Sequence, residues 1–262
     1  MTKGSDVLRI ADKHIGERYI LGARVPKNNA GWTGPWDCAE FASWCLFQSA
    51  GVLYGCLKDN GDPAVADAYT GYWQRDAGSL GTKVSVTVAA ATPGAFLLRY
   101  PQPGLNGHIA ISDGSGGTVE AHSSKRGVIA STVADRRWDT GILVPGMKYP
   151  APQAPPPVAK PAFVLRLKKP PMRGAVVRQL QRTLKARGCH PGKIDGSYGP
   201  QTAAAVHAFQ LDAGLVPDGE AGSQTLKALG ITIPQSRRGV AGRGRIRRTV
   251  HRRRGGSLPR FQ

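Results

Sequence analysis

Apolar residues recur at helical spacing in two early segments of the chain. Between Asp6 and Ile15 they mark one face of a first helix, and Asp6 occupies the position of an N-terminal cap. After a loop rich in Gly, Asn and Pro, Asp37 precedes a second apolar pattern over 38–50, which Gly51 ends. We therefore predict two helices here, with the second beginning directly after Asp37.

The pattern changes to short apolar or alternating runs between residues 92 and 144. Gly, Pro, Asn and Asp separate these runs, which is typical of strands joined by tight turns. The expected strands cover 95–98, 108–112, 118–122 and 127–130. Helices followed by a strand meander predict an α+β domain, in which N-terminal helices pack on an antiparallel sheet.

The segment 149–161 is rich in Pro and Ala, a composition that favours an extended spacer and cannot build a core. Beyond this spacer, helical stripes predict a small all-α domain of three helices. The motif D-G-x-x-G-x-Q-T occurs twice, beginning at Asp195 and at Asp218. Its final residues, Thr202 and Thr225, are expected to cap the last two helices.

These patterns divide the chain into four segments. The predicted boundaries are an α+β domain at 1–148, a linker at 149–171, an all-α domain at 172–232 and a tail at 233–262. Beyond Pro234 the tail carries ten Arg and no acidic residue, so it cannot form a core and is expected to be disordered when free.

The net positive charge of the chain is compatible with several polyanionic partners and does not distinguish among them. The formal net charge is +19, from 36 Lys and Arg against 17 Asp and Glu. Such a surface attracts polyanions, and the attraction weakens with salt. Through the Arg-rich tail, the candidates are anionic wall polymers, membrane phosphates and nucleic acid. Nothing in the sequence predicts obligate assembly, so we expect a monomer.

The sequence lacks the usual signals for export. No apolar run approaches the roughly 18 residues that a membrane helix requires. Residues 1–10 contain no apolar core of signal-peptide length. A substrate outside the membrane would therefore need another route of delivery. We expect either release from a host cytoplasm to the cell wall or carriage in a virion.

Four cysteines occur in the chain, at 38, 45, 56 and 189. They are too few for a disulfide scaffold, and no pair has the double spacing of a zinc site. We therefore expect free thiols, no metal and no cofactor. An isolated cysteine is more often a buried structural residue than a nucleophile, and Cys45 and Cys56 fit that interpretation.

Cys38 differs because it stands where the second helix should begin. Exposed N–H groups and the positive end of the helix dipole would favour its thiolate. His108, at the start of a predicted strand, is the candidate partner. Glu120 and His122 lie two apart on the next strand and face the same side, so either could orient His108.

Residues 6–144 resemble the NlpC family of papain-like cell-wall cysteine peptidases. The motifs that carry the resemblance are Trp36-Asp37-Cys38-Ala39-Glu40-Phe41, Pro93-Gly94-Ala95-Phe96, Gly107-His108-Ile109-Ala110-Ile111 and Thr118-Val119-Glu120-Ala121. The resemblance implies that Cys38 is the nucleophile, His108 its partner and Glu120 the third catalytic residue, with His122 as a neighbour. It also places Tyr19 and Asp37 near the substrate.

The sequence departs from this family at three positions. Ala39 and Glu40 stand where the family has Ser-Gly, and Ala95 replaces an Asp. The resemblance implies cleavage between D-glutamate and the diamino acid of a peptidoglycan stem peptide. One alternative is an N-acetylmuramoyl-L-alanine amidase of the Cys-His type. The other is a non-catalytic virion or wall-binding protein with a polyanion-binding tail.

Residues 172–231 resemble a three-helix peptidoglycan-binding module. The residues that this resemblance assigns to wall binding are Asp195, Tyr198, Gln210 and Asp218. Two resemblances on one chain point to peptidoglycan as the common partner. An anchored enzyme gains effective concentration on its polymer, within the reach of the linker.

Overall fold

A computed structural model describes residues 2–102, 105–134, 136–150 and 163–232. Most of the predicted linker and the whole Arg-rich tail lie outside these residues, so the expectations for them stay predictions. We refer to residues 2–150 as the N-terminal part and to residues 163–232 as the C-terminal part.

The N-terminal part consists of helices and an antiparallel sheet. The helices are α1 (Gly4–Asp12), α2 (Cys38–Ala50), α3 (Thr70–Ser79) and α4 (Val86–Ala90). The strands are β1 (Lys83–Val84), β2 (Phe96–Arg99), β3 (His108–Ser112), β4 (Gly117–Ser123), β5 (Gly127–Thr132) and β6 (Thr140–Ile142). Within the described residues these strands form one six-stranded sheet in the order β1-β6-β2-β3-β4-β5. The predicted α+β class is confirmed.

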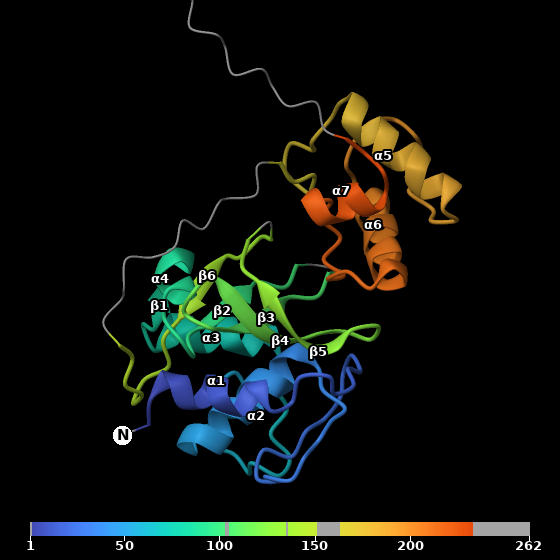
Figure 1. The fold of residues 1–262 in the computed structure, drawn as a ribbon. Coiled ribbons are helices and arrows are strands. Elements are labelled where there is room, and N and C mark those ends of the chain that lie inside the picture. The colour runs from blue at the N-terminus through green and yellow to red at the C-terminus, as the bar shows by residue number, and fades with distance from the viewer. Residues whose placement is uncertain (1, 103–104, 135, 151–162, 233–262) are drawn as a thin grey trace, which may run out of the picture. The chain divides into compact units, whose positions relative to one another are not determined.

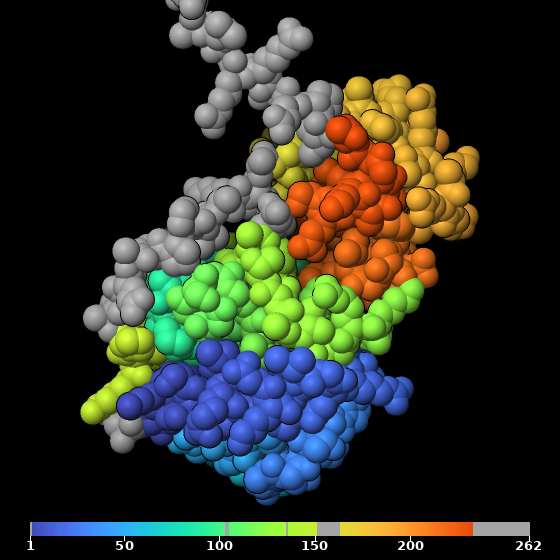
Figure 2. Space-filling model, in the orientation of Figure 1, coloured from blue at the N-terminus to red at the C-terminus, as the bar shows by residue number. Residues whose placement is uncertain are grey.

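Alternation along the strands separates two apolar layers. Phe96 and Ile109 face the main core with α1, α2 and α3, whereas Leu97 faces a smaller cluster that includes Ala89 of α4. Helices α1 and α2 lie together on one side of the sheet (Figure 1). In the space-filling view, the blue N-terminal residues form a continuous layer along one side of the green residues (Figure 2).

Helix α2 has the bounds that the sequence predicts. Asp37 caps its start, accepting a hydrogen bond from the Glu40 N–H at 2.8 Å. Gly51 ends it in the left-handed region at φ 67°, where a side chain would be strained. Cys38 is therefore the first residue of the helix.

The predicted start of α1 is wrong by three residues. The helix begins at Gly4, and Lys3 is its N-terminal cap. The Asp6 carboxylate accepts a hydrogen bond from the Lys3 N–H at 3.0 Å, so it closes a capping box from inside the first turn. An acidic residue near a helix start has the same sequence signature in either position.

Two helices of the N-terminal part have no counterpart in the sequence prediction. Helix α3 contains two glycines and α4 has five residues with three β-branched side chains, so neither shows a clear helical stripe. The usable signal was Ser85, whose hydroxyl caps α4 by accepting the Val88 N–H at 3.1 Å.

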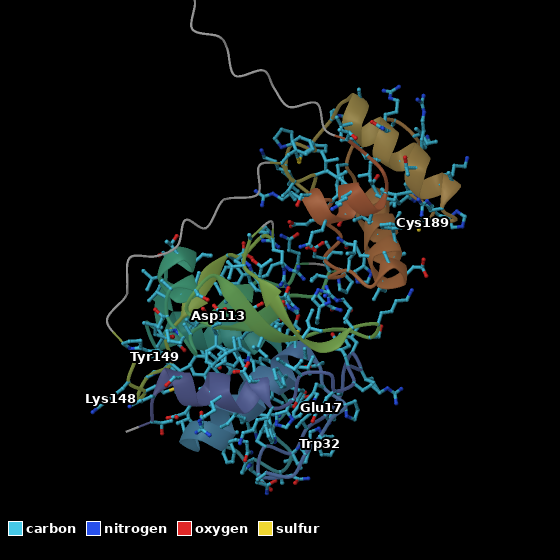
Figure 3. All side chains as sticks on the ribbon, in the orientation of Figure 1. Glu17, Trp32, Asp113, Lys148, Tyr149 and Cys189 are labelled. Atoms are coloured by element: carbon cyan, nitrogen blue, oxygen red, sulfur yellow. The ribbon has the colours of Figure 1, made fainter. Side chains whose placement is uncertain are left out.

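The two ends of the N-terminal part meet beside α1. Lys3 and Lys148 form a parallel β-bridge, and the Gly4 N–H donates to the Lys148 carbonyl at 2.9 Å. Figure 3 labels Lys148 and Tyr149 close to the start of this helix. A Cβ on Gly4 would lie 2.7 Å from the Tyr149 ring, so only glycine allows this approach.

A buried ion pair joins α2 to the loop that precedes it. The side chains of Lys27 and Glu40 are both fully buried and hydrogen-bonded to each other. The Glu40 carboxylate also accepts the N–H groups of Val25 at 3.1 Å and Ala68 at 2.8 Å. The Lys27 ammonium donates to the carbonyls of Val25 and Ala66 at 2.8 and 2.9 Å. The pair therefore ties two loops to α2.

The C-terminal part contains helices α5 (Ala175–Ala186), α6 (Pro200–Ala213) and α7 (Ser223–Ala228). The prediction of a small all-α segment is confirmed. The predicted threonine caps are wrong, because the caps are Gly199 and Gly222 and neither makes a side-chain cap bond. Thr202 and Thr225 lie inside the first turns of α6 and α7, where both are buried.

A buried glutamine explains the repeated motif. Gln181 donates to the Asp195 carboxylate and to the Thr202 hydroxyl, both at 3.1 Å. In the second copy, Gln210 donates to Asp218 at 2.6 Å and to Thr225 at 3.0 Å. Each glutamine oxygen also accepts the N–H of the motif's first glycine at 2.8 Å. The two loops are thus built by the same device.

Among the described residues, every helix is too short or too polar to span a bilayer.

The Lys27–Glu40 pair gives a stability prediction. Lys27→Met would leave the buried Glu40 carboxylate without its cationic partner, so we expect the free energy of unfolding to fall by about 3–5 kcal/mol. All five tryptophans lie in the N-terminal part, so urea denaturation followed by tryptophan fluorescence reports on that part alone. The exposed Lys58→Met is the matched control, and an equal loss in both variants would contradict the prediction.

Gln210 gives a local prediction in the C-terminal part. Gln210→Ala removes the acceptor of the Gly219 N–H and the donor to Asp218, so buried groups lose their partners. We expect hydrogen exchange at the Gly219 amide to accelerate at least about tenfold. The exposed Gln224→Ala should leave that amide unchanged. Equal protection in both variants would show that Gln210 does not hold the loop.

Candidate active site

Cys38 lies at the edge of the main core, where α2 begins. Its side chain is buried, and it lines a pocket with Tyr19, Asp37, His108 and His122. The pocket therefore brings together five of the six residues that the sequence assigned to catalysis and substrate binding. Glu120, the sixth, lies behind His108.

Burial controls the protonation of the thiol. Burial and then the Asp37 carboxylate raise the pKa of Cys38 to about 12, whereas the backbone N–H groups of Ile109 and Ala39 lower it. The N–H groups at the start of α2 favour the thiolate, as expected, but desolvation of the buried sulfur outweighs them. Chemistry at this sulfur requires a base.

His108 has the position for such a base. Its Nε2 is hydrogen-bonded to the Glu120 carboxylate, and its ring lines the pocket that holds Cys38. Since an ionised carboxylate only accepts, Nε2 carries the proton and Nδ1 keeps its lone pair. Among the described residues, no hydrogen bond joins the Cys38 sulfur to this ring; such bonds often form only when substrate binds.

A glycine brings His108 close to the neighbouring strand. Gly107 precedes it, and a Cβ at that position would lie 2.7 Å from the Arg99 carbonyl of β2. Any larger residue would push the start of β3 away from β2, so the glycine sets the position of the imidazole.

Of the two candidate partners for His108, the structure pairs it with Glu120. Glu120 and His122 both belong to β4, but the register of β4 against β5 shifts between Ala121 and Ser123. The His122 ring centroid lies 6.4 Å from that of His108, and its Nδ1 pairs with the Ser123 hydroxyl at 3.1 Å. Burial lowers the pKa of His122 to about 3, so this ring is neutral at physiological pH.

Glu120 has further partners that the sequence did not indicate. Arg136 donates two hydrogen bonds to its carboxylate, at 2.5 and 2.8 Å, and the Thr118 hydroxyl donates a third at 3.1 Å. Burial alone would raise the pKa of Glu120, but the charge of Arg136 and the hydrogen bonds from Arg136 and His108 hold it well below the usual value. Glu120 is therefore ionised. Burial lowers the pKa of His108, whose imidazole is neutral at pH 7.

Asp37 and Tyr19 line the pocket on the other side of Cys38. Burial raises the pKa of Asp37 to about 7, against hydrogen bonds from the N–H groups of Glu40 and Gly22 that lower it. The Tyr19 side chain is largely buried, and burial raises the pKa of its phenol, so the hydroxyl remains protonated. Both groups can therefore donate as well as accept near the sulfur.

The structure explains one departure from the family pattern. Glu40 points away from the pocket and pairs with Lys27 in the interior, so it does not take part in binding at the pocket surface. Ala39 lines the pocket and offers only a methyl group there. The pocket therefore lacks a side-chain hydroxyl at position 39.

The residues predicted to bind the wall are not equally exposed. Tyr198 is fully buried, and its hydroxyl donates to the Gly219 carbonyl at 2.7 Å, which joins the two repeated loops. Gln210 is also buried within its loop. These two side chains support the loops and offer no free surface. Asp195 is exposed and Asp218 half-buried, each with one carboxylate oxygen engaged in its own loop.

No group of three or more His, Cys, Asp or Glu side chains is arranged to hold a metal ion in the described part of the chain. The four cysteines are free, and Cys189 follows α5 (Figure 3).

Comparison with known families identifies the C-terminal part. Residues 173–229 match the family described as "Putative peptidoglycan binding domain". The C-terminal part thus belongs to a peptidoglycan-binding family. The N-acetylmuramoyl-L-alanine amidase CwlL of Bacillus licheniformis is 46% identical over 71 residues, 25% of this chain and 20% of its own length. The amidase CwlA of Bacillus subtilis is 42% identical over 66 residues, which cover 23% of this chain and 24% of that amidase.

These amidases match only over the peptidoglycan-binding region, so this chain spans about a fifth to a quarter of their length. Among solved structures, the N-terminal part is similar to the NlpC/p60 domain of the peptidoglycan hydrolase SagA. The two are 26% identical, with a TM-score of 0.39, over 54% of this chain and 99% of that one. An endolysin of Burkholderia phage AP3 is 46% identical over a region that covers 28% of this chain and 27% of the endolysin, with a TM-score of 0.24.

Asp37 gives a prediction for stability against pH. Its folded pKa of about 7 lies above the unfolded value near 3.8, so the folded state binds more protons between these values. This residue therefore lowers stability as pH rises from about 4 to 7. Asp37→Asn keeps a good helix cap and removes the titration.

We expect the stability of Asp37→Asn relative to the native protein to increase over that interval and to level off above it. Urea denaturation followed by tryptophan fluorescence at pH 4.5, 6 and 8 measures the difference. A difference that stays constant with pH would contradict the assigned titration.

Proposed function

We propose that the protein is a peptidoglycan hydrolase that cleaves stem-peptide bonds with Cys38 as its nucleophile. The proposal is carried by the arrangement of three side chains, two in the pocket and one behind them. Cys38 and His108 line one pocket, and Glu120 accepts a hydrogen bond from His108 behind it. A nucleophile, a base and a group that orients the base are the parts that cysteine catalysis requires.

In the first step, His108 Nδ1 takes the thiol proton as the Cys38 sulfur attacks the peptide carbonyl carbon. The negative charge moves to the carbonyl oxygen. The Cys38 N–H at the start of α2 has no partner within the helix and is suited to stabilise that oxyanion. Glu120 accepts from the imidazolium and keeps its tautomer fixed.

In the second step, the tetrahedral intermediate collapses and the C–N bond breaks. His108 returns the proton to the leaving amine, which leaves a thioester on Cys38. Water then attacks the thioester as His108 accepts its proton. The S–C bond breaks, the thiol is restored, and a carboxylate product leaves.

The second half of the chain supports the choice of polymer. Its match to a peptidoglycan-binding family indicates that the protein attaches to the cell wall. The amidase relatives match only that region and therefore do not indicate which bond the N-terminal part cleaves. We propose the D-glutamyl–diamino acid bond, on the resemblance of the motifs around Cys38 and His108 to those of the NlpC family.

The test is digestion of purified sacculi with the native protein and with Cys38→Ala. We expect the native protein to release new amino groups and Cys38→Ala to release none, because the variant lacks the nucleophile. Cys45→Ala, which changes a buried cysteine of the same helix outside the pocket, is the matched control.

Mass spectrometry of the fragments identifies the bond. A new N-terminus on the diamino acid supports the endopeptidase, whereas free lactyl groups on muramic acid together with L-alanine N-termini would show an amidase. Sacculi that release no amine with the native protein would exclude hydrolysis and favour a wall-binding role.

A further inference from the structure

We propose that Arg136 is a positioning residue of the active site, which fixes Glu120 and balances its charge so that His108 remains a free base. This inference rests on the proposed function. Local sequence does not reveal this role, because Arg136 follows β5 in a loop and belongs to none of the motifs around the pocket.

The geometry is that of a complete carboxylate site. The Glu120 side chain is fully buried, and both of its oxygens accept hydrogen bonds from Arg136 in the paired arrangement of guanidinium and carboxylate. His108 and Thr118 supply the remaining contacts. A buried carboxylate held by four hydrogen bonds has little freedom to rotate, so the imidazole that it contacts is fixed as well.

Trp138 holds the arginine in turn. The Arg136 guanidinium carbon lies 4.6 Å from the centre of the Trp138 ring, in the range of a cation–π contact. The same ring lies 5.9 Å from the His108 ring, and its Nε1 donates to the Val133 carbonyl at 3.2 Å. One indole therefore packs against both the base and the cation that stands behind it.

Charge balance gives Arg136 its chemical role. Glu120 and Arg136 together are neutral, so the neutral imidazole of His108 can accept a proton from Cys38. Without Arg136, a buried negative charge would stand alone beside the imidazole, which is costly in a low dielectric. The histidine–carboxylate pair would then hold an extra proton near neutral pH, and the base would be lost.

The other groups around His108 do not replace this charge. The charged and titratable side chains around it are Glu120 and His122 of β4, Arg99 of β2, the pocket residues Cys38, Asp37 and Tyr19, and Arg136 itself. Of the two arginines, only Arg136 is hydrogen-bonded to Glu120. The remaining groups are neutral or acidic and supply no positive charge.

The test is the pH dependence of amine release from sacculi at low substrate, compared for the native protein, Arg136→Gln and Arg136→Lys. In Arg136→Gln we expect the rising limb of the profile to move to higher pH by about one unit. The rate of amine release should therefore fall about tenfold more at pH 6 than at pH 8, relative to the native protein. Arg136→Lys keeps the charge without the paired geometry, so its limb should stay near the native position with a lower plateau.

The exposed Arg9→Gln on α1 is the control and should match the native profile. A uniform loss at every pH in Arg136→Gln would mean a merely structural role and would overturn the proposal. An equal limb shift in Arg136→Lys would overturn the charge argument.

A second measurement does not depend on activity. NMR titration of the His108 ring in Cys38→Ala, with and without Arg136→Gln, should give a higher midpoint when the arginine is absent. An unchanged midpoint would overturn the proposal. If the native protein releases no amine, the proposed function fails, while this titration still decides the role of Arg136.

Discussion

Burial of helix α2 constrains the rest of the N-terminal part. Its first nine residues, from Cys38 to Leu46, are all buried, so the helix needs partners on every side. The sheet, α1 and the loops around Lys27 and Tyr54 supply them. Because the helix starts at the edge of this core, its first residue faces the pocket while the next turns are held in the interior.

The interior of this part contains two buried glutamates with different partners. Glu40 is balanced by Lys27 and by backbone N–H groups of two loops, one of them that of Ala68, which lines the pocket. Glu120 is balanced by Arg136 and contacts the imidazole that lines the pocket. In both cases a cation and several hydrogen bonds replace the water that a buried carboxylate loses.

The C-terminal part uses uncharged groups for the same purpose. Each repeated loop closes around one buried glutamine amide, whose donor and acceptor both engage atoms of that loop. Tyr198 then connects one loop to the other. Of the four residues expected to bind the wall, Tyr198 and Gln210 are buried and Asp218 is half-buried, and all three hold the loops together. Only the Asp195 side chain is exposed.

The sequence by itself determined the features that depend on neighbouring residues. The bounds of α2, its Asp37 cap, the positions of β2 to β5 and the motifs at Cys38 and His108 follow from local spacing. The tertiary structure decided which side chains meet. Glu120 rather than His122 contacts His108, in a strand whose register shifts after Ala121, and a periodicity of two cannot reveal such a shift.

The roles of Lys27, Arg136 and Gln181 escaped prediction for a related reason. Their partners lie 13 to 16 residues away in Glu40, Glu120 and the first loop, on elements that only the folded chain brings together. From the sequence alone, such a polar residue is expected to lie on the surface and to bind water. Once it is buried, it must form its hydrogen bonds with another buried polar group, so the fold depends on the pair.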